Sequence, residues 1–187
     1  MKRVEDIKLA GKRVFIRCDF NVPLKGNRIV DDLRIVNALD TIRYVLKQKP
    51  ARIILASHLG RPRPGSGQEA LAKYSLAPIA KRLARLLGKT VYLHANILAP
   101  IETKHKIVLL ENLRFYEEEK QGSIRFAKQL AQHAEVYIND AFGTAHRKDA
   151  SVYALAKQLL CGAGKLLQKE QHYVHLHHER PIVAIFG

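Results

Sequence analysis

The chain has 187 residues, enough to bury the core of one large domain or of one domain plus a fragment. Its 32 Lys and Arg residues against 17 Asp and Glu residues give a formal charge of +15, which favours encounters with anions, nucleic acid included. Two cysteines without disulfide or zinc-site spacing predict a reducing, cytoplasmic location, and no apolar run approaches the roughly 20 residues of a membrane helix.

Five short apolar runs predict the strands of a parallel sheet. They lack the polar and apolar alternation of a sheet with one wet face, so we expect both faces to be buried. The runs are residues 14–17, 52–56, 91–93, 107–110 and 136–138. Because helical patterns lie between them, the sequence predicts a three-layer, Rossmann-like α/β domain with a mainly parallel sheet flanked by helices.

The helices are predicted from capping residues and apolar stripes. Asp31 and Asp32 favour a helix that ends before Pro50, Ser75 and Gly88 bound a second, and Ser123 begins a third. Residues 151–160 and 165–178 are typical of two further helices. The Pro and Gly residues of the stretch 61–70 predict a surface loop, and residues 181–187 are strand-like.

Polar side chains follow several of the predicted strands. The carboxyl ends of parallel strands share one edge of a sheet, so we expect these side chains to line a single cationic crevice. They are Asp19, Asn21, Arg34, His58, Arg61, Arg114, His146 and Arg147. Such a crevice suits a small phosphorylated metabolite.

Arginine suits an oxyanion because its planar fork offers several fixed donors, and histidine adds a donor whose charge varies near neutrality. Asp19 is placed to accept a hydrogen bond from a ligand hydroxyl, and Asn21 to donate to a carboxylate. Two plainer interpretations stay open at this point. The arginines could be ordinary surface residues, and Asp19 and Asn21 could satisfy backbone groups in a turn.

Two other patterns favour no site. The stretch CGAGKLL fails as a phosphate-binding loop because Leu159 and Leu166 stand where that motif needs Gly and Ser or Thr, and no GxGxxG fingerprint is present. The histidines near the end of the sequence are interpreted as a solvated helix face, so no metal site is expected. They are His172, His175, His177 and His178.

Five motifs in order, RCDFNVPL, DDLRIVNALDTI, SHLGRP, LLENLRFYEEE and INDAFGTAHR, closely resemble the amino-terminal half of the phosphoglycerate kinase family. The resemblance runs from about Ile7 to the final RPIVAIFG. It implies reversible phosphoryl transfer between 1,3-bisphosphoglycerate and ADP, forming 3-phosphoglycerate and ATP in glycolysis. Mg-ATP and Mg-ADP would be the nucleotide substrates of the complete enzyme.

The resemblance also implies roles for individual residues. Asp19 and Asn21 match residues that contact the hydroxyl and carboxyl end of the glycerate. Arg34 matches the catalytic residue that supports the transferring group. The remaining matches hold the phosphate that is not transferred, and they are His58, Arg61, Arg114 and Arg147.

The resemblance divides the chain into three parts. Residues 1–164 would form the phosphoglycerate-binding domain, 165–180 a connecting helix, and 181–187 the first strand of a missing nucleotide-binding domain. The nucleotide and magnesium sites would then lie in a carboxyl-terminal domain supplied in cis or in trans. We expect a monomeric complete enzyme and an isolated chain with little or no activity.

Some positions depart from the family pattern. Lys148 and Asp149 replace a small residue and His, and Asp149 would either weaken the anion site or cap the next helix, of which we favour capping. Lys165 and Gln168 replace apolar residues of the connecting helix, which questions its packing against a second domain. Two alternatives are a noncatalytic anion-binding module and an RNA-binding module, although the sequence has no recognisable RNA-binding motif.

Overall fold

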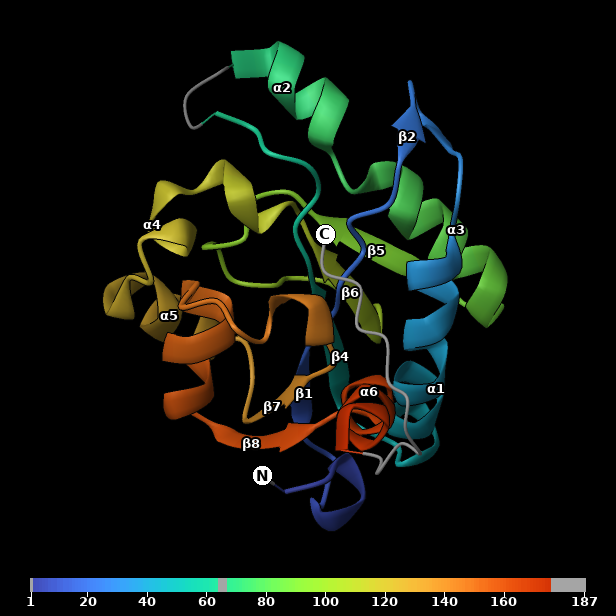
Figure 1. Cartoon of the computed structure of the whole chain (residues 1–187), viewed down its shortest axis with the longest axis vertical. Helices are drawn as coiled ribbons and strands as arrows, with labels where there is room; N and C mark the ends of the chain where they lie inside the picture. The colour runs from blue at the N-terminus through green and yellow to red at the C-terminus, as the bar shows by residue number, and fades with distance from the viewer. Residues whose placement is uncertain (1, 64–66, 176–187) are drawn as a thin grey trace, which may run out of the picture.

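The computed structural model describes residues 2–63 and 67–175. Its centre is a six-stranded, wholly parallel sheet with the order β5-β6-β4-β1-β7-β8 (Figure 1). The strands are β1 Arg13–Arg17, β4 Arg52–Ala56, β5 Val91–His94, β6 Ile107–Leu110, β7 Val136–Asn139 and β8 Leu160–Ala163. The five predicted strands and the parallel α/β architecture are therefore confirmed.

Helices cover both faces of the sheet, as the alternation within β1 demonstrates. Val14 and Ile16 belong to one buried cluster, which the helices α1 Leu33–Lys47 and α3 Ala77–Leu87 complete. Phe15 points the other way, into a second cluster with the helix α5 Ile124–Ala131. Such strands, buried on both sides, have no reason to alternate in polarity.

The remaining elements are short, except for α6 Lys165–His175, which packs against α1. Two further helices and a two-stranded hairpin lie outside the central sheet. The helices are α2 Gly67–Tyr74 and α4 Glu117–Lys120, and the hairpin consists of β2 Leu24–Lys25 and β3 Arg28–Ile29. Short 3-10 turns occur at Val4–Asp6, Leu113–Phe115, Phe142–Thr144 and Leu155–Lys157.

Local capping explains several helix ends. Ser123 Oγ accepts a hydrogen bond from Phe126 N at 3.3 Å, and Gly88 ends α3 with a left-handed φ of 61°. Asp31 Oδ1 accepts from Leu33 N at 2.9 Å, whereas the carboxylate of Asp32 pairs with Arg82 at 2.6 Å. These predicted boundaries hold to within two residues.

Two predicted segments were wrong. The expected loop 61–70 becomes the helix α2 from Gly67 onward. The expected helix 151–160 is a π-helical turn at Ala150–Ala154 followed by a 3-10 turn, and Leu160 already pairs with Val136 in β8. Pairing with β7 outweighs local helix propensity here, as tertiary contacts commonly do.

The polar residues of α6 find partners in the amino-terminal segment. Glu5 accepts a hydrogen bond from Gln168 Nε2 at 2.9 Å and lies 3.1 Å from Lys165 Nζ. Both polar side chains therefore have a partner within the chain. The strand-like run 181–187 and His177 and His178 lie outside the described residues. Among residues 2–63 and 67–175, the helices are all too short or too polar to cross a membrane.

Candidate functional site

One cavity of about 300 Å³ opens at the carboxyl edge of the sheet. Its walls come from the loops that follow β1, β4 and β7, from the turn after β6 and from the first turn of α1. The lining residues are Asp19, Asn21, Arg34, His58, Gly60, Arg61, Arg114, Gly143, Thr144, His146 and Arg147. The structure thus brings together every site residue that the sequence predicted, at the edge where parallel sheets bind ligands.

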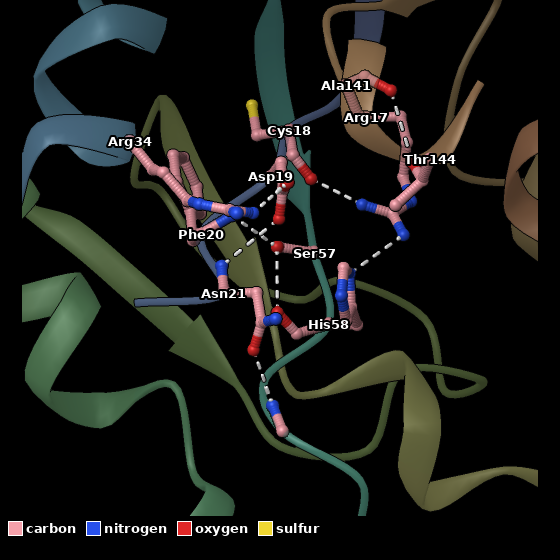
Figure 2. Close-up of polar contacts among 11 residues, drawn as sticks. Arg17, Cys18, Asp19, Phe20, Asn21, Arg34, Ser57, His58, Ala141 and Thr144 are labelled. Carbon is pink, nitrogen blue, oxygen red and sulfur yellow. Dashed lines mark hydrogen bonds and ion pairs between the residues drawn. The ribbon is translucent and has the colours of Figure 1, made fainter. Parts of the chain in front are cut away.

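Asp19 and Asn21 form hydrogen bonds and an ion pair that connect segments lining this cavity (Figure 2). Asp19 Oδ2 forms an ion pair with Arg34 Nη1, and Asp19 Oδ1 accepts from Asn21 N at 3.2 Å. Asn21 Oδ1 in turn accepts from Gly60 N at 2.8 Å. Both residues therefore satisfy backbone groups, as the plainer interpretation expected, and both also line the cavity.

Arg114 is oriented by the loop after β4. Its Nη1 donates to the carbonyl oxygen of Gly60 at 2.7 Å, and burial followed by repulsion from Arg147 lowers its pKa. Gly60 adopts a φ of 60°, and a Cβ there would lie 2.4 Å from Cε1 of Tyr74. Glycine is strongly favoured at this backbone position, and the carbonyl that aligns Arg114 belongs to it.

Asn112 also stabilises the loop after β4 through hydrogen bonds, and the sequence alone did not predict this role. This fully buried amide accepts from the backbone nitrogens of Leu59 and Arg114, at 3.2 and 3.0 Å. It donates to the carbonyl oxygens of Leu59 and Tyr74, at 2.8 and 3.0 Å. An Asn two residues after a predicted buried strand was the available signal, since buried polar groups need partners.

Arg147 has a counter-ion. Asp149 stands at the cap position directly before the turn Ala150–Ala154, but its side chain makes no capping hydrogen bond there. Its carboxylate instead accepts from Arg147 Nε at 2.8 Å and raises the pKa of that arginine. The expectation that Asp149 caps the next helix is therefore wrong for its side chain.

His58 is held neutral. Its Nδ1 lies 3.3 Å from Nη2 of Arg17, and its side chain is almost fully buried (Figure 2). Burial, with repulsion from Arg17, Arg114 and other arginines, lowers its pKa to about 2. The expectation of a charge that varies near neutrality is wrong for this histidine.

Arg17 is the main residue that the sequence analysis missed. It is fully buried within β1, and it reaches His58 from behind the cavity. An arginine inside an apolar strand was the signal, because a buried charge is costly unless it is paired.

The donor set suits an oxyanion. Of the four arginines that line the cavity, Arg34 and Arg147 are paired with carboxylates, while Arg61 and Arg114 form no ion pair with the described residues. Both carboxylates beside the cavity are thus engaged, so the residues here do not fit a magnesium ion. No group of three or more His, Cys, Asp or Glu residues in 2–63 and 67–175 is arranged to hold a metal.

Fold and cavity together define an α/β domain with an arginine-lined cleft at the carboxyl edge of a parallel sheet. The family model described as phosphoglycerate kinase matches residues 4–187, and the chain therefore belongs to the phosphoglycerate kinase family.

Curated relatives and solved structures agree with this assignment. The phosphoglycerate kinase of Borrelia turicatae is 47% identical over 100% of this chain and 49% of its own length, and that of Campylobacter lari is 48% identical over 98% and 48%. The structure of phosphoglycerate kinase from Coxiella burnetii superposes with a TM-score of 0.83 at 37% identity, covering 91% of this chain and 43% of that one. The chain thus spans about half the length of the curated relatives it matches.

Proposed function

We propose that this chain supplies the phosphoglycerate-binding half of a phosphoglycerate kinase, which transfers a phosphoryl group reversibly between 1,3-bisphosphoglycerate and ADP. The observation that carries the proposal is the convergence of four arginines, His58, Asp19 and Asn21 on one cavity of about 300 Å³. A small molecule with a carboxyl end, a hydroxyl and a phosphate matches this mixture of fixed donors and one carboxylate.

The residues have separate roles in this proposal. Asp19 accepts from the glycerate hydroxyl, Asn21 donates to its carboxyl end, and Arg34 supports the transferring phosphoryl group. The other phosphate binds the set that follows β4, β6 and β7, namely His58, Arg61, Arg114 and Arg147. In the direction of ATP use, a carboxylate oxygen of 3-phosphoglycerate attacks the terminal phosphorus and ADP leaves, so positioning and charge stabilisation supply the catalysis.

The nucleotide and its magnesium belong to a second half of the protein in this proposal. Residues 1–164 form the phosphoglycerate domain, 165–180 connect the halves, and 181–187 begin the nucleotide-binding domain. Two observations support the division, namely relatives of about twice the length and a helix that begins at Lys165. We further propose a monomeric complete enzyme in the cytoplasm, in keeping with the free thiols of Cys18 and Cys161.

Calorimetry tests the substrate assignment on the 187-residue chain. We expect 3-phosphoglycerate to bind, and ATP and a short RNA not to bind at the same protein concentration. Arg61→Ala, Arg114→Ala and Arg147→Ala should each weaken binding about tenfold or more, because each removes a charge-assisted hydrogen bond. Arg125→Ala removes an exposed arginine of α5 away from the cavity and serves as the control.

Unchanged binding in all three cavity variants would contradict the proposed site. RNA binding that falls steeply with salt would favour the nucleic-acid alternative instead. Addition of the carboxyl-terminal half of a relative, followed by an assay for ATP formation, then separates a competent half-enzyme from a noncatalytic anion-binding module.

A further inference from the structure

A buried arginine lies directly behind the cavity. Arg17 is fully buried, and each nitrogen of its guanidinium has a partner. Nε donates to Ser151 Oγ at 2.8 Å, Nη1 donates to the carbonyl oxygen of Cys18, and Nη2 faces His58 Nδ1 at 3.3 Å. The guanidinium is therefore held in one orientation from three sides.

Ser151 connects this arginine to a buried acid. Because Ser151 Oγ accepts from Arg17, its own proton goes to Glu119 Oε1, at 2.5 Å. Glu119 Oε2 accepts from Ser151 N at 2.9 Å, so both carboxylate oxygens act as acceptors. Ser151 and Glu119 are fully buried too. The positive charge of Arg17 is thus balanced inside the protein, which a charge at such depth requires.

The contact with Arg17 decides which nitrogen of His58 carries a proton. A guanidinium offers only donors and keeps its charge throughout the accessible pH range. Nδ1 of His58 must therefore be the acceptor, and the proton of the neutral ring resides on Nε2. A ring held this way presents an N–H group to the cavity that it lines.

We propose that Arg17, held by Ser151 and Glu119, is a positioning residue that fixes His58 as a neutral Nε2–H donor for an oxyanion in the cavity. The proposal rests on the proposed function, since it concerns how the same site recognises its phosphate group. Its consequence is that His58 contributes a hydrogen bond to the anion that does not depend on pH.

The surroundings of His58 support this state of the ring. The groups that face it or share its cavity are Arg17, Asp19, Arg34, Arg61, Arg114, His146, Arg147 and, through Arg147, Asp149. Arginines outnumber carboxylates among them, and Asp19 and Asp149 are both paired. A protonated imidazole would therefore add a further positive charge to a buried cationic cluster, which agrees with the lowered pKa of His58.

Nitrogen-15 NMR of the 187-residue chain without ligand tests the tautomer directly. We expect His58, assigned by comparison with His58→Gln, to show a protonated Nε2 and an acceptor Nδ1, unchanged between pH 5 and 8. A ring that titrates near its ordinary pKa, or that carries its proton on Nδ1, would overturn the proposal. If the chain did not bind 3-phosphoglycerate, the proposed function would be contradicted. The NMR measurement would still decide the tautomer of His58, because it needs no ligand.

The double variant Arg17→Met with Glu119→Gln tests the cause. It removes both buried charges at similar volume, so no lone charge stays buried. Burial and the remaining arginines still oppose protonation of His58, so we expect the tautomer to change instead. Nδ1 loses its donor, the proton should be shared between Nδ1 and Nε2 in nitrogen-15 NMR, and the affinity for sulfate at pH 7 should fall about twofold or more. Both proteins keep His146 and the four arginines of the cavity, so the difference in sulfate affinity reports on His58.

His133 serves as the internal control for folding. It is buried far along the sequence from Arg17, and its Nε2 lies 2.7 Å from the carbonyl oxygen of Ile97. An unchanged His133 signal shows that the double variant is folded. With that control intact, a His58 whose proton stays wholly on Nε2 would overturn the role of Arg17.

Discussion

Arg147 Nε donates to Asp149 Oδ2 at 2.8 Å, so one of the arginines of the cavity has a counter-ion within its own loop. The aspartate side chain is 5% exposed, whereas that of Arg147 is 37% exposed. The carboxylate is therefore shielded and the guanidinium still reaches the cavity. A negative charge in this place partly offsets the field that an incoming phosphate would meet.

Asp149→Asn should therefore tighten the binding of 3-phosphoglycerate. The amide keeps an oxygen that accepts from Arg147 but removes the charge, and we expect a gain of about three- to fivefold, the range of a partly exposed ion pair. Calorimetry at low salt measures it, with Glu102→Gln, an exposed acid away from the cavity, as the control. Equal or weaker binding would show that Asp149 aligns Arg147 more than it neutralises it.

The position of the site was predictable because it follows from chain order. Asp19, His58, Arg114 and Arg147 come after strands, and the ends of parallel strands share an edge whatever their side chains contact. The partners of these residues were not predictable. Arg17 and Ser151 are separated by 134 positions in the sequence, and no local pattern indicates that they meet.

Asp140 predicts a pH dependence of stability. This fully buried carboxyl accepts from Leu166 N at 3.0 Å and Leu167 N at 3.3 Å at the start of α6, while its Oδ2 has no partner among the described residues. Burial raises its pKa to about 6. The folded chain therefore binds this proton more tightly than the unfolded chain, and stability rises as the pH falls from about 7 towards 4.

Urea unfolding at pH 7.5 and pH 5 measures that contribution. We expect Asp140 to add about 1–1.5 kcal/mol to the free energy of unfolding at pH 5 relative to pH 7.5. Other groups titrate too, so the comparison is with Asp140→Asn, which should lack this increment while keeping an acceptor oxygen for α6. The same pH dependence in both proteins would show that Asp140 is ionised when folded, as an ordinary aspartate is.

Gly60→Ala should damage both stability and anion binding. The new Cβ meets Tyr74 at 2.4 Å in a left-handed backbone, and the carbonyl oxygen of Gly60 aligns Arg114. We expect a loss of about 2–3 kcal/mol in the free energy of unfolding, together with weaker binding of 3-phosphoglycerate.

Gly26→Ala is the matched control for that substitution. Gly26 has a φ of 58°, almost that of Gly60, but nothing lies within 4 Å of the Cβ that would be added. It should lose only the backbone contribution, about 1 kcal/mol, and bind 3-phosphoglycerate normally. If both variants lost the same stability, the contact with Tyr74 would not contribute to the cost. If Gly60→Ala bound 3-phosphoglycerate normally, the carbonyl oxygen of residue 60 would not be needed to align Arg114 for binding.

Arg34 and Arg61 should differ in what they contribute to the complete reaction. The side chain of Arg34 is 53% exposed at the mouth of the cavity, where its ion pair with Asp19 holds it. In the proposed site, a group in that position would meet the transferring phosphoryl group more than the phosphate that stays on the substrate. With the second half supplied from a relative, Arg34→Ala should lower kcat by roughly a hundredfold, the cost typical of losing one donor to a developing charge.

Arg61→Ala should act mainly on binding. Arg61 makes no ion pair with the described residues, and in the proposed site it holds the phosphate that stays on the substrate. Its loss removes an interaction that is equal in the ground state and the transition state, so KM for 3-phosphoglycerate rises while kcat changes little. Steady-state kinetics of the two variants distinguishes the roles. If Arg34→Ala raised KM and spared kcat as Arg61→Ala is expected to do, Arg34 would be a binding residue, and stabilisation of the transferring group would come from elsewhere.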